Sequence, residues 1–178
     1  MMVSARKNPA SGNAYKLLVG LGNPGATYAH TYHNAGAYCL RLFAEQEKFK
    51  HHTRGLFEYY KGYDQILVMP RTFMNQSGEA VARAMQFFRI PLEALLVIHD
   101  DFDLALGTVK YAVARGSAGH LGVQSIIETL HTNQFARVRL GVRTIPGRAE
   151  ELVLRTMTPG AREAIARACY SLAMINST

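Results

Sequence analysis

The stretch that most constrains this chain runs from Tyr15 to Gly36. An apolar run over 17–19 ends at Gly20 and predicts a buried strand. A dense turn signal at 22–25 follows, and then come several polar or aromatic side chains: Tyr28, His30, Tyr32, His33 and Asn34. In α/β proteins, a strand that ends in a glycine-rich turn is a common place for a binding or catalytic site. The stretch therefore predicts a site just beyond the first strand.

The same glycines also match G-x-G-x-x-G, the pattern of dinucleotide-binding folds, over residues 20–25. An acid, Glu45, lies about 20 residues further on, as that pattern requires. However, Glu45 falls inside a helical periodicity and not at the end of a second strand. In addition, Pro24 removes a backbone N–H from the turn that would hold a pyrophosphate. A dinucleotide site is therefore the weaker interpretation, and a purely structural strand, turn and helix remains open.

Length and composition indicate one globular domain. The chain has 178 residues, of which 48% are hydrophobic, so it can bury a core and is not a disordered segment. No apolar run approaches the ~20 residues of a membrane helix. The segment 1–14 lacks the apolar core of a secretion signal and predicts a short flexible tail. We therefore expect a single domain over 15–178 and a cytoplasmic protein.

The charge balance points to an anionic partner. The net charge is +7, and 14 of the 20 basic residues are arginine, the side chain best suited to phosphate. The two cysteines, Cys39 and Cys169, both fall in apolar helical patterns and lack zinc-site spacing. We expect them to be two buried thiols in a reducing compartment.

Helical and strand patterns alternate along the whole chain. The predicted helices lie at 35–49, 77–89 and 123–130 and from 159 onward, and the predicted strands lie at 17–19, 55–61, 65–69, 94–98, 108–114 and 135–142. His51 and His52 fall in a polar linker. Two of the strands are close enough for a hairpin, which makes the sheet mixed. The prediction is an α/β fold with a mixed central β-sheet flanked by helices.

Candidate catalytic groups follow three of the apolar strands. His33 is a candidate base, because a neutral imidazole can take a proton from water near neutral pH. Asp100, at the end of the strand 94–98, could orient that imidazole and stabilise its charged form. The amide of Asn75, which follows another strand, could donate to an oxyanion. From the spacing alone, Asp100 could equally cap a turn.

The acidic cluster around Asp100 also suggests a metal site. Asp100, Asp101 and Asp103 offer three carboxylates in four positions, a set that suits a hard cation. In a strand, however, alternate residues point to opposite faces of the sheet. The metal site is therefore a second interpretation of this cluster.

Several blocks together resemble one family. Residues 20–36 read GLGNPG-x-x-Y-x-x-x-x-HNAG, and this pattern is similar to the signature of bacterial-type peptidyl-tRNA hydrolases. FMN followed by SG at 73–78, HDDFDL at 99–104, Gly119-His120 and RVRLG at 137–141 match further blocks in the same order. The resemblance covers most of residues 15–143.

The resemblance implies hydrolysis of the ester between peptide and tRNA, in a monomer that needs no metal or cofactor. By it, His33 activates water, Asp100 orients His33, Asn75 binds near the ester, and Asn23 senses a blocked amino group. Tyr28 and Phe73 would contact the tRNA 3′ end, and Met74 and His120 would line the substrate site. Arg139 would bind a phosphate of the tRNA backbone.

The chain departs from the family pattern where RNA contacts are expected. Leu121 replaces an asparagine, Tyr32 an arginine, and Ala112 a second phosphate-binding lysine. Lys110, two residues from Ala112 on the same strand face, is our candidate replacement. Leu121 could line the cleft or face the core of the next helix. Some relatives with this fold bind RNA without hydrolysing it, so a catalytically weak RNA-binding protein is the alternative function.

Overall fold

The computed structural model describes residues 15–62, 64–144 and 149–175, and the predicted tail at 1–14 lies outside the described residues. The strands are β1 (Leu17–Gly20), β2 (Lys50–Arg54), β3 (Phe57–Lys61), β4 (Ile66–Pro70), β5 (Leu95–Ala105), β6 (Val109–Val113) and β7 (Ala136–Arg143). The α-helices are α1 (Ala35–Gln46), α2 (Ser77–Phe88), α3 (Leu121–Leu130), α4 (Ala149–Leu152) and α5 (Pro159–Ile175). Short 3₁₀ turns are η1 (Tyr32–Asn34), η2 (Met74–Gln76) and η3 (Leu92–Ala94).

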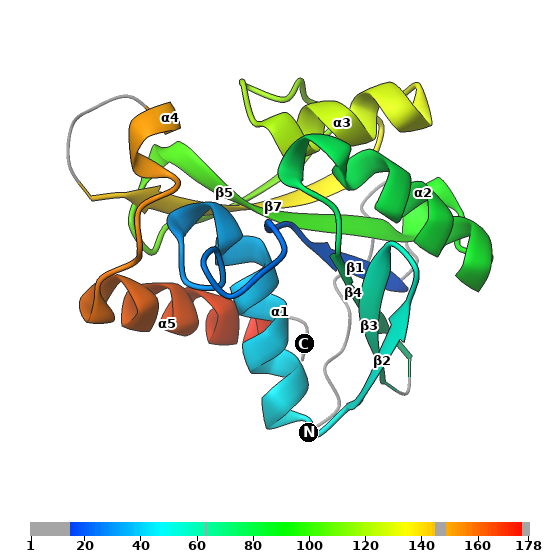
Figure 1. Cartoon of the computed structure of the whole chain (residues 1–178), viewed down its shortest axis with the longest axis horizontal. Coiled ribbons are helices and arrows are strands. Elements are labelled where there is room, and N and C mark those ends of the chain that lie inside the picture. The colour runs from blue at the N-terminus through cyan, green and yellow to red at the C-terminus, as the bar shows by residue number, and fades with distance from the viewer. Residues whose placement is uncertain (1–14, 63, 145–148, 176–178) are drawn as a thin grey trace.

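All seven described strands form one sheet in the order β2-β3-β4-β1-β5-β7-β6 (Figure 1). The central strands β4, β1, β5 and β7 run parallel, whereas β2, β3 and β6 join antiparallel at the two sides. The prediction of an α/β fold with a mixed sheet is confirmed. Because the four central strands are parallel, their carboxyl ends share one edge of the sheet.

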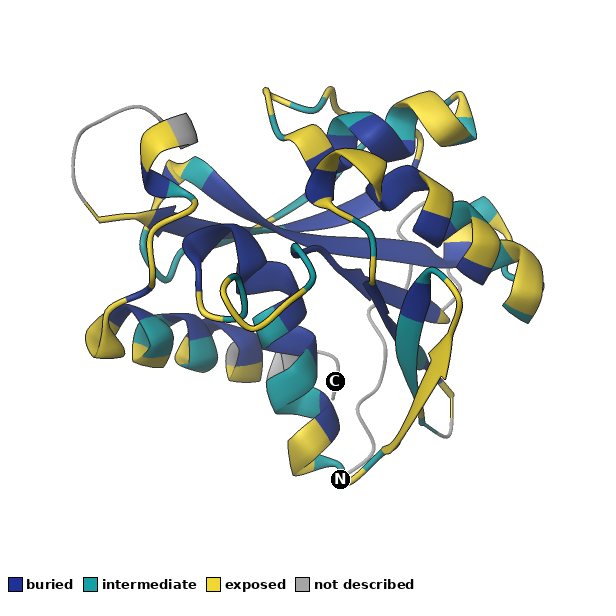
Figure 2. Cartoon of the chain, viewed as in Figure 1, coloured by how far each residue is buried: buried dark blue, intermediate teal, exposed yellow. Residues whose placement is uncertain are grey.

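Helices cover both faces of the sheet. The helices α1 and α5 lie on one side in Figure 1, and α2 and α3 lie on the other. Successive residues of β5 alternate between the two cores, with Leu96 and Ile98 on the α1/α5 side and Leu95 and Val97 on the α2/α3 side. In Figure 2 the buried positions accordingly fill the central strands and the inner helix faces, whereas β2 is exposed. This alternation, with a period of two, sets where each side chain after Ile98 points.

Gly36 lets α1 approach the sheet where the site begins. A Cβ atom on Gly36 would lie 2.2 Å from the carbonyl oxygen of Ile98, so only glycine fits there. Two backbone hydrogen bonds join the same elements: the N–H of Leu21 donates to Ile98 O, and the N–H of Ala37 donates to Leu21 O, at 2.9 and 3.0 Å. The start of α1 is therefore fixed against the ends of β1 and β5.

The structure corrects three expectations. The first helix ends at Gln46, and the polar stretch with His51 and His52 is an exposed edge strand, β2, and not a linker. β5 continues through the acidic cluster to Ala105. The two cysteines are not separate thiols, because the packing of α1 against α5 joins Cys39 and Cys169 in a disulfide with a Cα–Cα distance of 5.6 Å. None of the helices in the described part of the chain is long and apolar enough to cross a membrane.

Candidate active site

One cavity of about 530 Å³ lies at the carboxyl ends of β1, β4 and β5. Nine of the eleven predicted site residues line it: Asn23, Tyr28, His33, Phe73, Met74, Asn75, Asp100, His120 and Leu121. Lys110 and Arg139 do not belong to its lining and lie on β6 and β7. Residues separated by almost a hundred positions therefore converge because their strands end at one edge of the sheet.

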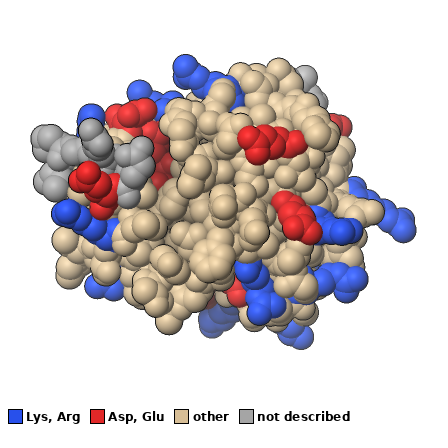
Figure 3. Space-filling model, turned by 45° about the horizontal axis from the view of Figure 1, so that its top comes forward, with Lys and Arg blue, Asp and Glu red and all other residues tan. Residues whose placement is uncertain are grey.

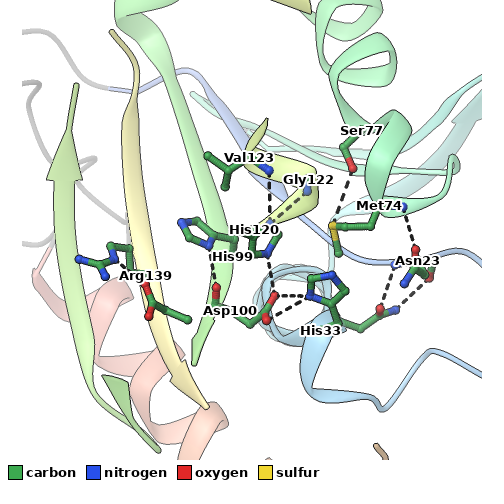
Figure 4. A network of polar contacts seen from close by, with 12 residues as sticks. Asn23, His33, Met74, Ser77, His99, Asp100, His120, Gly122, Val123 and Arg139 are labelled. Atoms are coloured by element: carbon green, nitrogen blue, oxygen red, sulfur yellow. Dashed lines mark hydrogen bonds and ion pairs between the residues drawn. The ribbon is translucent and has the colours of Figure 1, made fainter. Parts of the chain in front are cut away.

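His33 and Asp100 are in direct contact. The Nδ1 atom of His33 lies 2.9 Å from Oδ1 and 3.1 Å from Oδ2 of Asp100 (Figure 4). Since the carboxylate only accepts, Nδ1 carries the proton and donates to it. The other ring nitrogen of His33, Nε2, is then the basic atom. His33 lies in η1, and its backbone N–H donates to the carbonyl of Val153 at 2.7 Å.

His120 binds the same carboxylate from the other side. Its Nε2 lies 2.9 Å from Oδ1 of Asp100, and its Nδ1 accepts from the backbone N–H groups of Gly122 and Val123 at 3.1 and 3.3 Å. His120 is therefore the N-cap of α3, and that cap fixes its proton on Nε2. Both nitrogens of His120 are engaged, so His33 is the histidine of this pair with a free basic atom.

Burial and charge act in opposite directions on this cluster. Burial alone lowers the pKa of His33, but the negative charge and hydrogen bond of Asp100 prevail and raise it above its ordinary value. Burial alone raises the pKa of Asp100, but the charges and hydrogen bonds of His33 and His120 hold it far below its usual range. Asp100 is therefore ionised whenever His33 titrates.

Asn23 is held rigidly by Asn34. The Asn23 N–H donates to Asn34 Oδ1 at 2.8 Å, and Asn34 Nδ2 donates to the Asn23 carbonyl at 2.9 Å. The Asn23 side-chain oxygen in turn accepts from the backbone N–H of Met74 at 2.7 Å. Because a backbone N–H only donates, this bond fixes the amide orientation and leaves its Nδ2 donors available. Figure 4 shows His33 between Asp100 and Asn23.

Arg139 is paired within the protein. Its Nε donates to Oδ2 of Asp101 at 2.6 Å, and its side chain is 18% exposed. Lys110 lies directly opposite Arg139 in the β6–β7 ladder and is exposed. The two cations are thus neighbours across the ladder, and the guanidinium of Arg139 is already paired with the carboxylate of Asp101.

A buried arginine supports the loop that carries His120. Arg137, whose residue is 2% exposed, donates from its two Nη atoms to the carbonyls of Gly116 and Arg115 at 3.0 and 2.5 Å. These carbonyls belong to the loop that ends at His120. Burial, with the nearby Arg139 and Arg115 charges, lowers the pKa of Arg137. Arg137 thus ties β7 to one wall of the cavity.

One further histidine and the three departures from the family pattern have different surroundings. His99 is buried, its Nδ1 donates to the Asp100 carbonyl at 2.7 Å, and burial and the nearby His120 hold its pKa well below the ordinary value. It lines the cavity as a neutral group. Tyr32 is buried in the α1/α5 core and Ala112 is buried on β6, so neither offers a surface to RNA. Leu121, in contrast, is 58% exposed and lines the cavity.

The acidic cluster does not converge as a metal site would. Asp100 binds the two histidines, Asp101 binds Arg139, and Asp103 is exposed. Within the described ranges, the one group of ligand-type side chains that could hold a metal is His33, Asp100 and His120, whose atoms lie within 4.8 Å. Those atoms already bond one another at hydrogen-bond distance.

Three residues that help to build this site were not predicted as site residues: Asn34, His99 and Arg137. Asp101 was predicted only as a candidate metal ligand, and it binds Arg139. Asn34 occupies the N-cap position of α1, but its side chain makes no capping bond and binds Asn23. The signal was present in HNAG, because Asn34 directly follows His33. Arg137 gave no such signal, since its burial depends on the loop above it.

The fold and site define a class: α/β proteins with a buried histidine–aspartate pair in a cleft at the ends of parallel strands, an arrangement suited to general-base hydrolysis. The family model described as Peptidyl-tRNA hydrolase matches residues 17–176, well beyond the motif blocks. The chain belongs to this family.

Relatives and solved structures agree with this assignment. A peptidyl-tRNA hydrolase of Mycobacterium tuberculosis is 38% identical over 88% of this chain and 86% of its own length. One from Syntrophomonas wolfei is 42% identical over 78% and 79%. The crystal structure of peptidyl-tRNA hydrolase from Acinetobacter baumannii superposes with a TM-score of 0.80, at 29% identity, over 91% of this chain and 86% of that one.

Proposed function

We propose that this chain hydrolyses the ester bond between peptide and tRNA in peptidyl-tRNA, with His33 as the base. The observation that carries the proposal is the hydrogen bond from His33 Nδ1 to Asp100 in a cavity at the carboxyl edge of the sheet. That bond fixes the tautomer in which Nε2 can accept a proton.

The chemistry follows from that tautomer. Nε2 of His33 takes a proton from water while the water oxygen bonds to the ester carbonyl carbon. Asp100 stabilises the imidazolium that forms, because it is buried and ionised. When the ester C–O bond breaks, the imidazolium returns the proton to the ribose oxygen. The products are free tRNA and a peptide carboxylate.

Two amides bind the acyl part in this proposal. Asn75, exposed in η2 and lining the cavity, donates to the developing oxyanion. Asn23 offers Nδ2 donors, because its oxygen is engaged by Met74. A peptide carbonyl accepts from those donors, whereas the free ammonium of an aminoacyl-tRNA is itself only a donor. The pair therefore favours the blocked substrate.

In this proposal, aromatic and basic side chains bind the tRNA part of the substrate. Tyr28 and Phe73 lie edge to face with centroids 6.3 Å apart, and Phe73 is 54% exposed, which suits stacking on an unpaired 3′ base. Lys110 and Arg139 bind a phosphate beyond the cavity. In Figure 3 the displayed face is largely uncharged, with basic side chains around its margins. The proposal places the protein in the cytoplasm as a monomer.

The test is release of peptide from one tRNA in two forms. The purified protein is incubated with N-acetylated aminoacyl-tRNA and with the same aminoacyl-tRNA unblocked. The proposal expects hydrolysis of the first and sparing of the second. Binding of both without hydrolysis would identify an RNA-binding relative and contradict the proposal.

A further inference from the structure

Exposed apolar side chains concentrate at the active-site cavity. Among the described residues, five large apolar side chains are exposed: Phe73, Phe87, Leu121, Leu154 and Tyr170. Three of the five, Phe73, Leu121 and Leu154, line this one cavity. Exposed apolar surface that gathers in one concave place marks a binding surface. Phe73 is already assigned to the RNA end, which leaves the two leucines.

The two leucines come from different segments, and each follows a residue that contacts His33. Leu121 follows His120, whose ring centroid is 4.8 Å from that of His33. Leu154 follows Val153, whose carbonyl accepts the His33 backbone N–H at 2.7 Å. Their exposed fractions are 58% and 52%. Each leucine is thus one residue away from a group in contact with the proposed base.

The position of the reacting carbon determines what these leucines meet. In the proposed hydrolysis, the ester carbonyl carbon lies beside His33 Nε2, within reach of the attacking water. The Cα of the peptide's last residue is bonded to that carbon. Its side chain therefore branches two bonds from that carbon, in the part of the cavity next to His33. The leucine side chains can neither donate nor accept a hydrogen bond. They therefore stabilise a bound side chain only by burying its apolar surface.

We propose that Leu121 and Leu154 form an apolar subsite for the side chain of the peptide's last residue, the one esterified to tRNA. This specificity rests on the proposed function and extends it to a substrate class: peptides that end in a large apolar residue. The exposed Asp103 lines the same cavity, so an acidic last residue is further disfavoured by like charge.

The experiment varies only the last residue. One tRNA body is charged with N-acetylleucine, N-acetylglycine or N-acetylaspartate, and kcat/KM is measured for each. Wild-type protein should prefer leucine over glycine by about 10-fold or more, as apolar pockets discriminate side chains that differ by a few carbons. Aspartate should be no better than glycine. A leucine-to-glycine ratio within about twofold of one overturns the proposal, while hydrolysis of all three leaves the proposed function intact.

Variants locate the subsite. Leu121→Asn keeps the side-chain size and removes its apolar character, and Leu154→Ala removes the side chain. Each should lower the leucine-to-glycine ratio several-fold. Tyr170→Ala is the matched control, because Tyr170 is exposed and apolar but lies on α5 outside the cavity lining, and it should keep the wild-type ratio. An unchanged ratio in both leucine variants overturns the assignment. Absence of hydrolysis with every substrate overturns the proposed function itself.

Discussion

Asp100 accepts hydrogen bonds from His33 and His120 on one oxygen, each at 2.9 Å, yet only His33 keeps a basic nitrogen free. The second ring nitrogen of His120, Nδ1, accepts hydrogen bonds from the backbone N–H groups of Gly122 and Val123 in the first turn of α3. Because the backbone of α3 occupies Nδ1 of His120, only His33 of this pair has a ring nitrogen free to accept a proton from water. The same carboxylate raises the pKa of the histidine that remains.

This relationship predicts a pH dependence. The base must be neutral, and Asp100 raises the pKa of His33 above 6.5, so kcat/KM should rise with pH through a midpoint above 6.5. In Asp100→Asn the raising charge is lost and burial alone acts, which lowers the pKa of His33. The midpoint should then move to lower pH while the plateau rate falls. A midpoint that stays in place or moves upward in Asp100→Asn would show that another group titrates.

Asn34 is predicted to matter through Asn23. Asn34→Ala removes two hydrogen bonds that hold the Asn23 backbone and leaves its partly buried N–H and carbonyl unpaired, at a cost of about 1–3 kcal/mol in the free energy of unfolding. Asn23 should lose its fixed orientation, so discrimination between N-acetylated and free aminoacyl-tRNA should weaken. Thermal unfolding and the two hydrolysis rates measure this. A stability loss with unchanged discrimination would limit Asn34 to a structural role.

We predict that Asp101 weakens phosphate binding at Lys110 and Arg139, because it pairs with Arg139. Removing Lys110 or Arg139 should weaken tRNA binding and reduce its salt slope by about one unit each. Asp101→Asn should do the opposite, because it frees the Arg139 guanidinium from a 2.6 Å ion pair. Titrations of tRNA at several salt concentrations test both directions.

Lys50→Ala is the matched control for these titrations. Lys50 is exposed on β2 at the opposite edge of the sheet, so its removal should leave the salt slope nearly unchanged. If Lys110→Ala and Lys50→Ala behave alike, the specific phosphate site on β6 is wrong. Arg115, in the loop after β6, would then be the next candidate.

Activity is predicted to survive chelation. Hydrogen bonds already join Asp100 to His33 and His120, and Asp101 is paired with Arg139. Exhaustive EDTA treatment should therefore leave kcat/KM within about twofold, a margin below 1 kcal/mol in transition-state free energy. Loss of activity that magnesium or manganese restores would establish the metal interpretation.

The sequence predicted what depends on local pattern. The mixed sheet could be predicted from the apolar run 17–19, the hairpin spacing and the helical periodicities. The spacing of apolar residues in each element follows from which of its faces is buried. The sequence could not predict β2, since every residue of Lys50–Arg54 is exposed and the strand exists only by pairing with β3. The Cys39–Cys169 disulfide could not be predicted from the sequence either, because it depends on how α1 packs on α5.

The candidate site was predicted mainly from the family motifs, and residue types and spacing alone supported only part of it. Residue types alone suggested His33 and Asp100 but could not choose between a catalytic pair, a turn cap and a metal ligand. The sequence also could not show the 2.9 Å contact between the two side chains, because it brings together residues 67 positions apart. The pairing of Arg139 with Asp101 was also out of reach, since it depends on the β5–β7 register.

The central claim is that His33 activates water, and single-turnover hydrolysis by His33→Ala tests it most directly. With bound N-acetyl-aminoacyl-tRNA in both cases, the variant should be slower than wild type by roughly 10²–10⁴-fold, while tRNA affinity stays similar. His52→Ala, which removes an exposed histidine from β2, should turn over at the wild-type rate. Near-normal turnover in His33→Ala would contradict the account.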